Sequence, residues 1–421
     1  MEIRERIESY LVERLVPFWL DRVADPDGGF LTYFDRNGRP TGQTDKTLIQ
    51  QTRTLFMLSL LERSGRGAGR AGKLAAAGLD FLLEKFWDKE QGGWFWITDR
   101  GGRPLQSDKI VYGQSFAIYA LSEYALAVGD RRAADYAVRT FDLLQKYAAD
   151  TAFGGYREMF RSDWSPRPGG DLGGDRKSFD VHMHLMEAFT SLCELTGREI
   201  HRRKLREVVR VLWERMLDPA SGTGIAQFEL DFRPRPAISF RTVWGSDRDH
   251  GGRPRPLDNT SYGHNIEFFW LLLRSLEALG EPAAPYRARL RRLVEHTRRY
   301  GLDERYGGLY VEGRTAGPAR DRQKEFWQQA EALVGFLDAY LLFGERPYWE
   351  AFRNIFDFVW TKVINHQAGE WYALLDRRGR VRWDYLGHAW KNNYHTVRSM
   401  TESLKRLERI QGRPELAAGL E

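Results

Sequence analysis

The sequence predicts an all-α fold, an (α/α)6 barrel in which two concentric rings of helices carry short β-hairpins at one end. The first observation behind this prediction is a glycine-rich hairpin signature that recurs six times. It reads GGF, GGW, GGY, SGTG, GGL and GEW, starting at Gly28, Gly92, Gly154, Ser221, Gly307 and Gly369. Internal repeats determine architecture before any local pattern does, so six units in one chain indicate a repeat fold.

The second observation is a regular alternation of helices. Each signature follows an amphipathic helix and precedes a second helix that is richer in apolar and aromatic residues. The expected pairs, in chain order, are Ile3–Ala24 with Thr47–Arg63, Ala71–Trp87 with Val111–Val128, Ala133–Tyr147 with Ser178–Leu195, Arg198–Leu217 with Tyr262–Leu279, Pro285–Tyr300 with Gln323–Leu342, and Tyr348–Ile364 with Asn392–Ile410. The more apolar helix of each pair is expected to form the inner ring.

Hairpins are expected between the two helices of each pair. The segments FLTYFDRNGRP (30–40) and WFWITDRGGRP (94–104) alternate apolar and polar residues and then enter Asn-Gly or Gly-Gly turns. In a barrel, all of these hairpins open at the end where the inner helices begin.

The alternative arrangement of these helices is an open solenoid. Closure is favoured because the chain stops at six units and lacks the polar capping repeats that an open solenoid needs. We therefore expect one barrel domain over residues 1–421, about 30 Å deep for helices of about 20 residues. The segment 246–259, rich in Gly, Pro, Arg and Asp, lengthens the fourth repeat and is expected to lie at the pocket mouth.

Composition and charge exclude several classes of protein. The net charge of +6 comes from arginines scattered along helices, whereas nucleic-acid binding needs a concentrated patch or a reader motif. Cys193 is the single cysteine, which excludes an intrachain disulfide and a cysteine metal site. The 14 Trp, 18 Tyr and 24 Phe are enough for a large core and for a sugar site.

The N-terminal segment and the hydropathy pattern indicate where the protein works. The segment MEIRERIESYLVERL mixes charged and apolar residues at helical spacing, unlike the uncharged stretch of a signal peptide. No run approaches the ~20 apolar residues that span a bilayer. We expect a soluble, cytoplasmic protein with no membrane partner, and the sequence does not indicate an oligomeric state.

Unusual polar and aromatic residues collect near the starts of the expected inner helices. They are Arg53, Tyr112, Gln114, Ser115, Asp180, His182, His184, His264, Glu267, Trp327, Gln328, Glu331, Trp390, Lys391, Tyr394, His395 and Arg398. Because their spacing follows the hairpin repeat, we expect most of them to converge on one axial pocket.

Four histidines in this set point to proton transfer. Imidazole has an ordinary pKa of ~6.5 and so both takes up and releases protons near neutral pH. His264 and His395, from different walls of the barrel, are suited to act on opposite faces of a planar intermediate. Asp180 and His184 share a helix face at i and i+4, whereas His182 lies about 200° from His184 around the helix. We therefore expect His184 in the site and a structural role for His182.

Three other uses of these residues fit the sequence less well. A zinc or iron site is possible with Asp180 and Glu267, but the sequence has no HExxH pair and no dense ligand cluster, so no metal or other cofactor is expected. A glycoside hydrolase needs two carboxylates and leaves the histidines without a role. A sugar-binding module explains Trp327 and Trp390 as stacking platforms, but it does not explain the acid–base set.

The motifs at the inner helices resemble those of the acylglucosamine 2-epimerase superfamily, in particular its cellobiose/mannobiose 2-epimerase and mannose 2-epimerase branches. They are YGQSFAIYALSEY (112–124), HMHLMEAF (182–189), GHNIE (263–267), WQQAEALVGF (327–336) and WKNNYH (390–395). The resemblance covers nearly the whole chain. It implies an (α/α)6 barrel and cofactor-independent epimerisation at C2 of an aldose through a cis-enediolate.

The resemblance also implies roles for individual residues. His264 and His395 are the proton-transfer pair, His184 assists opening of the sugar ring, and Arg53 stabilises the enediolate oxygens. Trp327 and Trp390 pack on the sugar. The residues expected to bind hydroxyl groups or support the site are Tyr112, Asp180, Glu267, Lys391 and Tyr394.

One departure from the family pattern concerns the substrate. The disaccharide-type enzymes carry NTHLH where this chain has DVHMH, with Asp180 at the asparagine position. This variant is more similar to the free-mannose epimerases, so we expect interconversion of free glucose and mannose. The alternatives are epimerisation of the reducing-end sugar of β-1,4-disaccharides such as cellobiose and mannobiose, and mannose–fructose ketol isomerisation.

Overall fold

The computed structural model describes residues 2–240 and 254–417, and all twelve predicted helices are present in it. The outer helices are α1 (Glu2–Tyr10) continued by α2 (Val16–Arg22), α4 (Ala71–Phe81), α6 (Arg131–Leu143), α8 (Glu199–Arg215), α10 (Arg287–His296) and α12 (Arg346–Phe358). The inner helices are α3 (Leu48–Arg63), α5 (Val111–Val128), α7 (Phe179–Thr196), α9 (Tyr262–Leu279), α11 (Phe326–Phe343) and α13 (Asn393–Gln411). A short helix, α14 (Pro414–Ala417), follows them.

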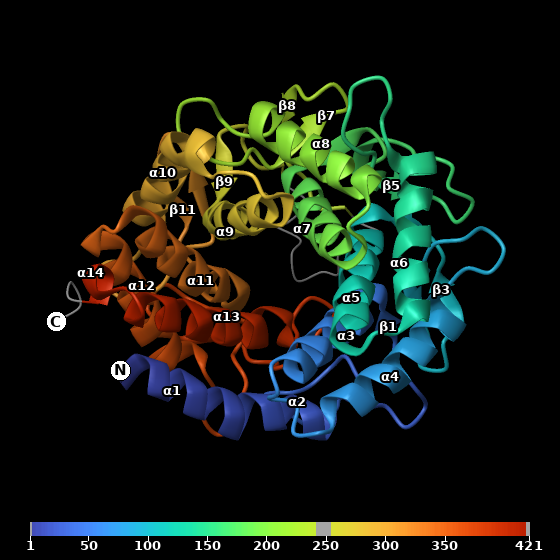
Figure 1. Cartoon of the computed structure of the whole chain (residues 1–421), viewed down its shortest axis with the longest axis horizontal. Helices are drawn as coiled ribbons and strands as arrows, with labels where there is room; N and C mark the ends of the chain where they lie inside the picture. The colour runs from blue at the N-terminus through green and yellow to red at the C-terminus, as the bar shows by residue number, and fades with distance from the viewer. Residues whose placement is uncertain (1, 241–253, 418–421) are drawn as a thin grey trace.

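Burial separates the two rings as the sequence predicts. In α5 every residue from Val111 to Ala125 is buried, whereas α12 buries one face and exposes the other. An apolar helix is stable only when it is covered all round, and an amphipathic helix covers its neighbour while its polar face meets water. Figure 1 shows the inner helices surrounded by the outer ones.

The ring is closed, which decides against an open solenoid. Each inner helix contacts the next one, and the last inner helix, α13, contacts the first, α3. The backbone closes at the same point, where Phe34 N–H donates to the Gly387 carbonyl at 3.0 Å. The first hairpin therefore pairs with the loop of the sixth repeat.

Most outer helices end in a π-helical turn. These turns are η2 (Leu82–Phe86), η3 (Leu144–Ala148), η7 (Thr297–Gly301) and η8 (Val359–Val363). The N-terminal helix is predicted as one element, and a π turn, η1 (Leu11–Leu15), interrupts it just before Pro17. Proline has no N–H to donate, so a change in the hydrogen-bond pattern is expected at this point. Two short 3₁₀ turns also lie among the described residues, η4 (Gly170–Leu172) and η6 (Ala284–Tyr286).

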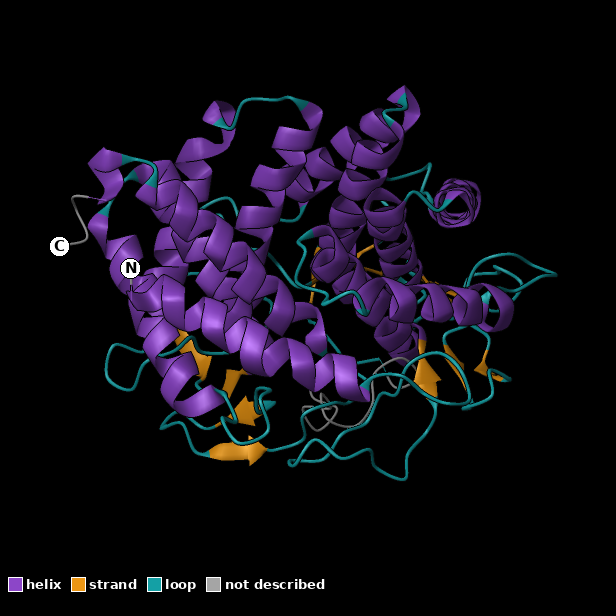
Figure 2. Cartoon of the chain, turned by 60° about the horizontal axis from the view of Figure 1, so that its bottom comes forward, coloured by secondary structure: helices purple, strands orange, loops and turns teal. Residues whose placement is uncertain are grey.

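Within residues 2–240 and 254–417, the strands form five small antiparallel sheets at one end of the barrel (Figure 2). Each sheet joins the strand before an inner helix to the hairpin of the next repeat. The sheets are β1 (Lys46–Thr47), β2 (Ile97–Thr98) and β3 (Pro104–Gln106); β4 (Lys109–Ile110) and β5 (Met159–Phe160); β6 (Arg176–Ser178), β7 (Gln227–Glu229) and β8 (Pro234–Arg235); β9 (Asn259–Ser261), β10 (Glu312–Arg314) and β11 (Gly317–Asp321); and β12 (Lys324–Glu325), β13 (Leu374–Leu375) and β14 (Val381–Trp383). The fifth inner helix begins at Phe326 and not at Gln323, because Lys324–Glu325 pair with β13.

A buried ion pair anchors most of the hairpins. A lysine two residues before the inner helix bonds to an acidic residue at the preceding hairpin. These pairs are Lys46–Asp25, Lys109–Asp88, Lys177–Asp150, Lys324–Asp303 and Lys391–Glu370. The fourth repeat has Thr260 at this position, and its hydroxyl donates to the Gly224 carbonyl at 2.8 Å.

A second contact holds the hairpin to the fourth residue of the inner helix. In α3 the Gln51 side chain bonds to both the N–H and the carbonyl of Phe30, at 2.9 and 2.8 Å. The same position bonds to the hairpin backbone through Gln114, His182, Asn265 and Gln329. We call these lysine and fourth-residue contacts the hairpin clamp.

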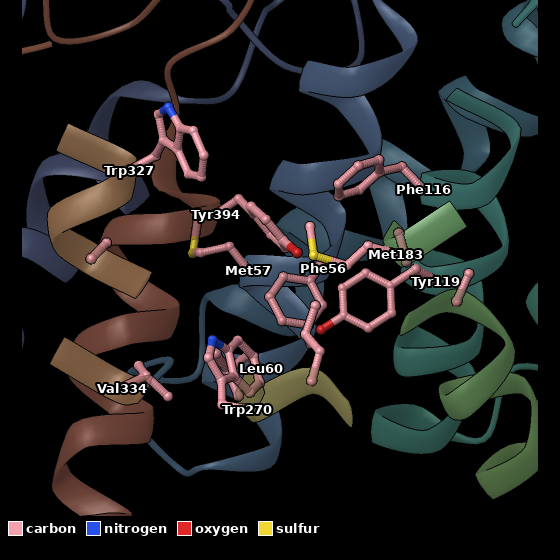
Figure 3. Close-up of a cluster of buried hydrophobic side chains, with 14 of the residues drawn as sticks. Phe56, Met57, Leu60, Phe116, Tyr119, Met183, Trp270, Trp327, Val334 and Tyr394 are labelled. Carbon is pink, nitrogen blue, oxygen red and sulfur yellow. The ribbon is translucent and has the colours of Figure 1, made fainter. Parts of the chain in front are cut away.

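Side chains from the inner helices fill the barrel axis below its mouth. Figure 3 shows Phe56, Tyr119, Trp270 and Tyr394 pointing toward one another below Trp327. All of these are buried. The axis below the mouth is therefore a packed core in the described part of the chain.

Two of the predictions concern the pocket mouth and the membrane. Most of the expected mouth segment, 246–253 of 246–259, lies outside the described residues. Within the described ranges, the helices are all too short or too polar to cross a bilayer.

Candidate active site

A cavity of about 720 Å³ opens at the hairpin end of the barrel. Four of the predicted site residues line it, and each lies in the first turn of a different inner helix: Tyr112 on α5, Asp180 on α7, His264 on α9 and Trp327 on α11. They converge because the inner helices all start at this end. A pocket of this size is in the range used for small ligands.

Two of the predicted histidines meet at the Trp327 ring. The centroid of that ring lies 4.7 Å from the His264 ring and 5.7 Å from the His395 ring. His264 is half-buried at the cavity wall and His395 is 5% exposed. The structure thus brings together the two histidines that the sequence predicts as a pair, beside an aromatic surface.

His395 is oriented by a carboxylate. Its Nδ1 lies 2.6 Å from Glu331 Oε1. Burial, together with the positive charges of Arg53 and Arg398, holds the pKa of His395 well below its ordinary value. The imidazole is therefore neutral at neutral pH. With Nδ1–H donated to Glu331, Nε2 carries the free lone pair that accepts a proton.

His184 has the same kind of partner. Its Nδ1 lies 3.0 Å from Glu187 Oε2, one turn further along α7. The rings of Tyr112 and Phe116 pack against the His184 ring at 5.1 and 4.8 Å. Although burial raises the pKa of Glu187, the charge of Arg398 and the contact with His184 outweigh it and lower that pKa to about 2. Glu187 is thus an ionised acceptor for Nδ1–H.

His182 belongs to the hairpin clamp. Its Nε2 accepts from Tyr156 N–H at 3.0 Å, and its Nδ1 donates to the Ser178 carbonyl at 2.9 Å. Burial lowers the pKa of His182 to about 4, so the ring is neutral. Both ring nitrogens are used within the protein fold. The structure therefore gives His182 the position that glutamine fills in three other repeats.

Arg53 lies beside the cavity wall. Its Nη2 donates to the Tyr112 hydroxyl at 2.9 Å, and its guanidinium lies over the Phe116 and Tyr394 rings at 4.4 and 4.8 Å. The side chain is 2% exposed, and its Nε has no hydrogen-bond partner among the described residues. A fixed positive charge at this place suits an anionic intermediate.

Three further predicted residues, Trp390, Tyr394 and Lys391, lie at different depths around the site. Trp390 lies at the mouth, with its ring 6.1 Å from that of Tyr112 and 6.2 Å from that of Trp96. Tyr394 is buried below the site and donates to Glu187 at 2.7 Å. Lys391 differs from expectation, because its Nζ bonds to Glu370 at 3.1 Å and to the Leu386 carbonyl. We therefore assign Lys391 to the hairpin clamp and not to the substrate.

Glu267, Glu331 and His395 form a group with metal-like spacing. Their potential ligand atoms lie within 4.8 Å of one another. Arg398 Nη2, however, donates to Glu267 Oε1 at 3.0 Å and to Glu331 Oε1 at 2.7 Å. A guanidinium already supplies a cation to both carboxylates, so the donor set does not favour an added metal ion. The expected absence of a metal stays a prediction.

Sequence reasoning gave no role to Glu187 or Arg398. The missing signal was the register of the inner helices. Arg53, His184, Glu267, Glu331 and Arg398 are each the sixth residue of their helix, and they form one layer below the cavity. Aligning the helix starts, in place of the hairpins, would have identified this layer.

An (α/α)6 barrel with histidine–carboxylate contacts and aromatic rings at one mouth combines acid–base groups with surfaces on which a sugar can stack, and this combination is compatible with the class of the sugar isomerases. A model of the N-acylglucosamine 2-epimerase (GlcNAc 2-epimerase) family matches residues 28–399, and the chain belongs to this family. The protein is therefore an isomerase.

Three relatives illustrate the similarity. Cellobiose 2-epimerase of Bacteroides fragilis is 28% identical over 417 residues, which cover 96% of this chain and 98% of that protein. D-mannose isomerase of Marinomonas mediterranea is 25% identical over 410 residues, covering 94% and 96%. The solved structure of cellobiose 2-epimerase from Spirochaeta thermophila matches with a TM-score of 0.85 at 30% identity, covering 97% of this chain and 98% of that chain.

Proposed function

We propose that the protein interconverts the glucose and mannose configurations at C2 of an aldose, with free mannose and glucose as its substrates. The observation that carries this proposal is the neutral His395, whose Nδ1 is held by Glu331 at 2.6 Å beside the Trp327 ring that His264 also contacts. A sugar stacked on this indole lies within reach of two imidazoles.

The proposed reaction moves one proton off C2 and another onto it. His184 assists opening of the sugar ring. One imidazole of the His264–His395 pair takes the C2 proton, and the electron pair of the C–H bond forms a cis-enediolate. Arg53 stabilises its oxygens. The other histidine enters the step as the imidazolium and donates its proton to the opposite face of C2, which inverts the configuration and leaves that ring neutral. Water exchange on the imidazoles leads to solvent hydrogen at C2.

Two neighbouring activities have specific support. The cavity of about 720 Å³ has room beyond one pyranose, and two of the relatives above are named cellobiose 2-epimerase. A reducing-end disaccharide is therefore the second candidate substrate. A third relative is named D-mannose isomerase, and the same enediolate yields a ketose when the proton returns to C1. Asp180 at the cavity wall supports the free monosaccharide, because the disaccharide-type motif carries asparagine there.

Product analysis tests the proposal. Mannose, mannobiose and cellobiose are each incubated with the protein in deuterium oxide containing a chelator, and the products are identified by chromatography and NMR. We expect mannose to give glucose with one deuterium at C2, and kcat/KM for mannose to exceed that for either disaccharide. Fructose as the main product would make the protein a ketol isomerase. Failure to convert any of the three sugars contradicts the proposal.

The two histidines of α7 are expected to respond differently to the same substitution. His182→Gln keeps a side chain that bonds to the hairpin backbone, as Gln51 and Gln114 do, so turnover is expected to stay within a few-fold of wild type. His184→Gln removes the ring-opening imidazole, and we expect a loss of ~10²-fold in rate. Steady-state kinetics on mannose check both variants, and an equal loss in the two would show that His182 has the role given to His184.

A further inference from the structure

One buried arginine joins three inner helices beneath the cavity. Arg398 lies on α13 and is 2% exposed. Its guanidinium bonds to Glu187 of α7, to Glu267 of α9 at 3.0 Å and to Glu331 of α11 at 2.7 Å. We call Arg398 and these three glutamates the carboxylate cluster.

Two members of the carboxylate cluster also hold the site histidines. Glu331 Oε1 lies 2.6 Å from His395 Nδ1, and Glu187 Oε2 lies 3.0 Å from His184 Nδ1. Arg398 is therefore one side chain away from each imidazole. When Nδ1–H of either histidine donates to its carboxylate, Nε2 is the nitrogen left to accept a proton from the substrate.

Arg398 compensates the negative charge of the three buried glutamates. Three carboxylates and a single guanidinium are all buried, and uncompensated charge in the interior is costly. Burial raises the pKa of both Glu267 and Glu331, and the two carboxyl groups repel each other, so this pair does not favour two negative charges at once. The guanidinium favours the ionised form of Glu187, which accepts Nδ1–H and cannot donate to it.

We propose that Arg398 is a positioning residue that fixes the Nδ1–H tautomer and the ring orientation of both His184 and His395 through Glu187 and Glu331. The proposal rests on the proposed proton transfer. It adds that one shared group, Arg398, fixes the tautomer of both histidines. A substitution at Arg398 is therefore expected to disturb both imidazoles through the glutamates.

A purely structural role for Arg398 has a matched control in the same helix. Arg406 follows Arg398 by two turns of α13 and is also buried. It bonds to Asp338 of α11 at 2.7 Å and to Glu402, and neither carboxylate contacts a histidine in the described part of the chain. Arg406→Met therefore removes a buried arginine–carboxylate contact outside the carboxylate cluster, and the Arg406 guanidinium lies 5.7 Å from the ring of Trp270, which donates to Glu331.

The experiment compares Arg398→Met, Arg398→Lys and Arg406→Met with wild type. Deuterium exchange at C2 of mannose is measured per mole of folded protein, and imidazole nitrogen shifts in NMR spectra report the histidine tautomers. We expect Arg398→Met to lose ~10²-fold in kcat with a smaller change in KM, and to show mixed tautomers at His184 and His395. Arg406→Met is expected to lower the melting temperature but to keep wild-type tautomers and a kcat within about three-fold of wild type.

Arg398→Lys keeps a positive charge and covers the case in which Arg398→Met does not fold. An ammonium cannot reproduce the planar fork that reaches three carboxylates, so we expect a partial loss in kcat and a changed tautomer at one or both histidines. Unchanged tautomers in a folded Arg398 variant would overturn the proposal, as would an equal loss of kcat in Arg406→Met. Wild-type protein that turns over none of the sugars refutes the proposed function instead, and its tautomers still test the role of Arg398.

Discussion

His395→Ala and His264→Ala are each expected to lower the rate of C2 epimerisation by at least ~10²-fold, the usual scale for a lost general acid or base. The reason lies in the geometry of the pair. Both rings contact Trp327, and His395 is held neutral with Nδ1 on Glu331. Removing either imidazole leaves one face of C2 without a proton carrier.

The two variants are measured by deuterium exchange at C2 and by mannose-to-glucose conversion. If one variant still exchanges the C2 hydrogen but does not invert C2, the histidine that remains in it is the one that removes the proton. His366→Ala is the control, because the His366 side chain is exposed and its Nε2 bonds to the Trp360 carbonyl on an outer helix. The double variant His264→Ala/His395→Ala is expected to be little worse than either single one, since residues that act as a unit are not additive. Near-normal turnover in both single variants would refute the two-histidine mechanism.

Arg53→Met is expected to lower kcat by ~10²–10³-fold, the effect of losing a donor to a developing oxyanion. The guanidinium is fixed by Tyr112 and by two aromatic rings, so its charge is already in place when the enediolate forms. Methionine fills a similar volume without charge or hydrogen bonds. Arg53→Lys keeps the charge and is expected to lose less.

The same variant is expected to change the pH dependence of the reaction. Burial contributes most to the lowered pKa of His395, and the charge of Arg53 contributes next. His395 accepts a proton only when neutral, so activity falls as the pH drops through its pKa. In wild type this acid limb of kcat/KM is expected well below pH 6.5, the ordinary histidine value. Removing the Arg53 charge raises the pKa of His395, so the limb moves to higher pH in Arg53→Met and stays in place in Arg53→Lys. Identical pH profiles in all three proteins would contradict this expectation.

The helices and their order were predictable because they follow from local patterns. The glycine signature marks each hairpin, and the periodicity of apolar residues identifies each helix and the ring to which it belongs. The errors were small and local, such as the start of α11, where Lys324–Glu325 join a sheet that no helical pattern records. The π turn before Pro17 is of the same kind.

The residues of the site were less predictable than the helices that carry them. His264, His395 and Trp327 could be found because histidine and tryptophan are unusual at the start of a helix. Lys391 was placed with the substrate because it stands beside Trp390 and Tyr394, yet it faces Glu370 in the hairpin clamp. A side chain's neighbours along the chain do not decide which way it points.

By itself, the sequence determined six repeats, twelve helices, their inner or outer position and the end of the barrel where polar residues collect. All of these depend on periodicity within a helix or on spacing between repeats. The tertiary structure alone decided the partners of the site residues. Glu187 and Arg398 bond although 211 positions separate them, and Phe34 pairs with Gly387 to close the ring. Such contacts exist only after closure sets the register between helices, because the rotation of each inner helix about its own axis is fixed by packing against its neighbours.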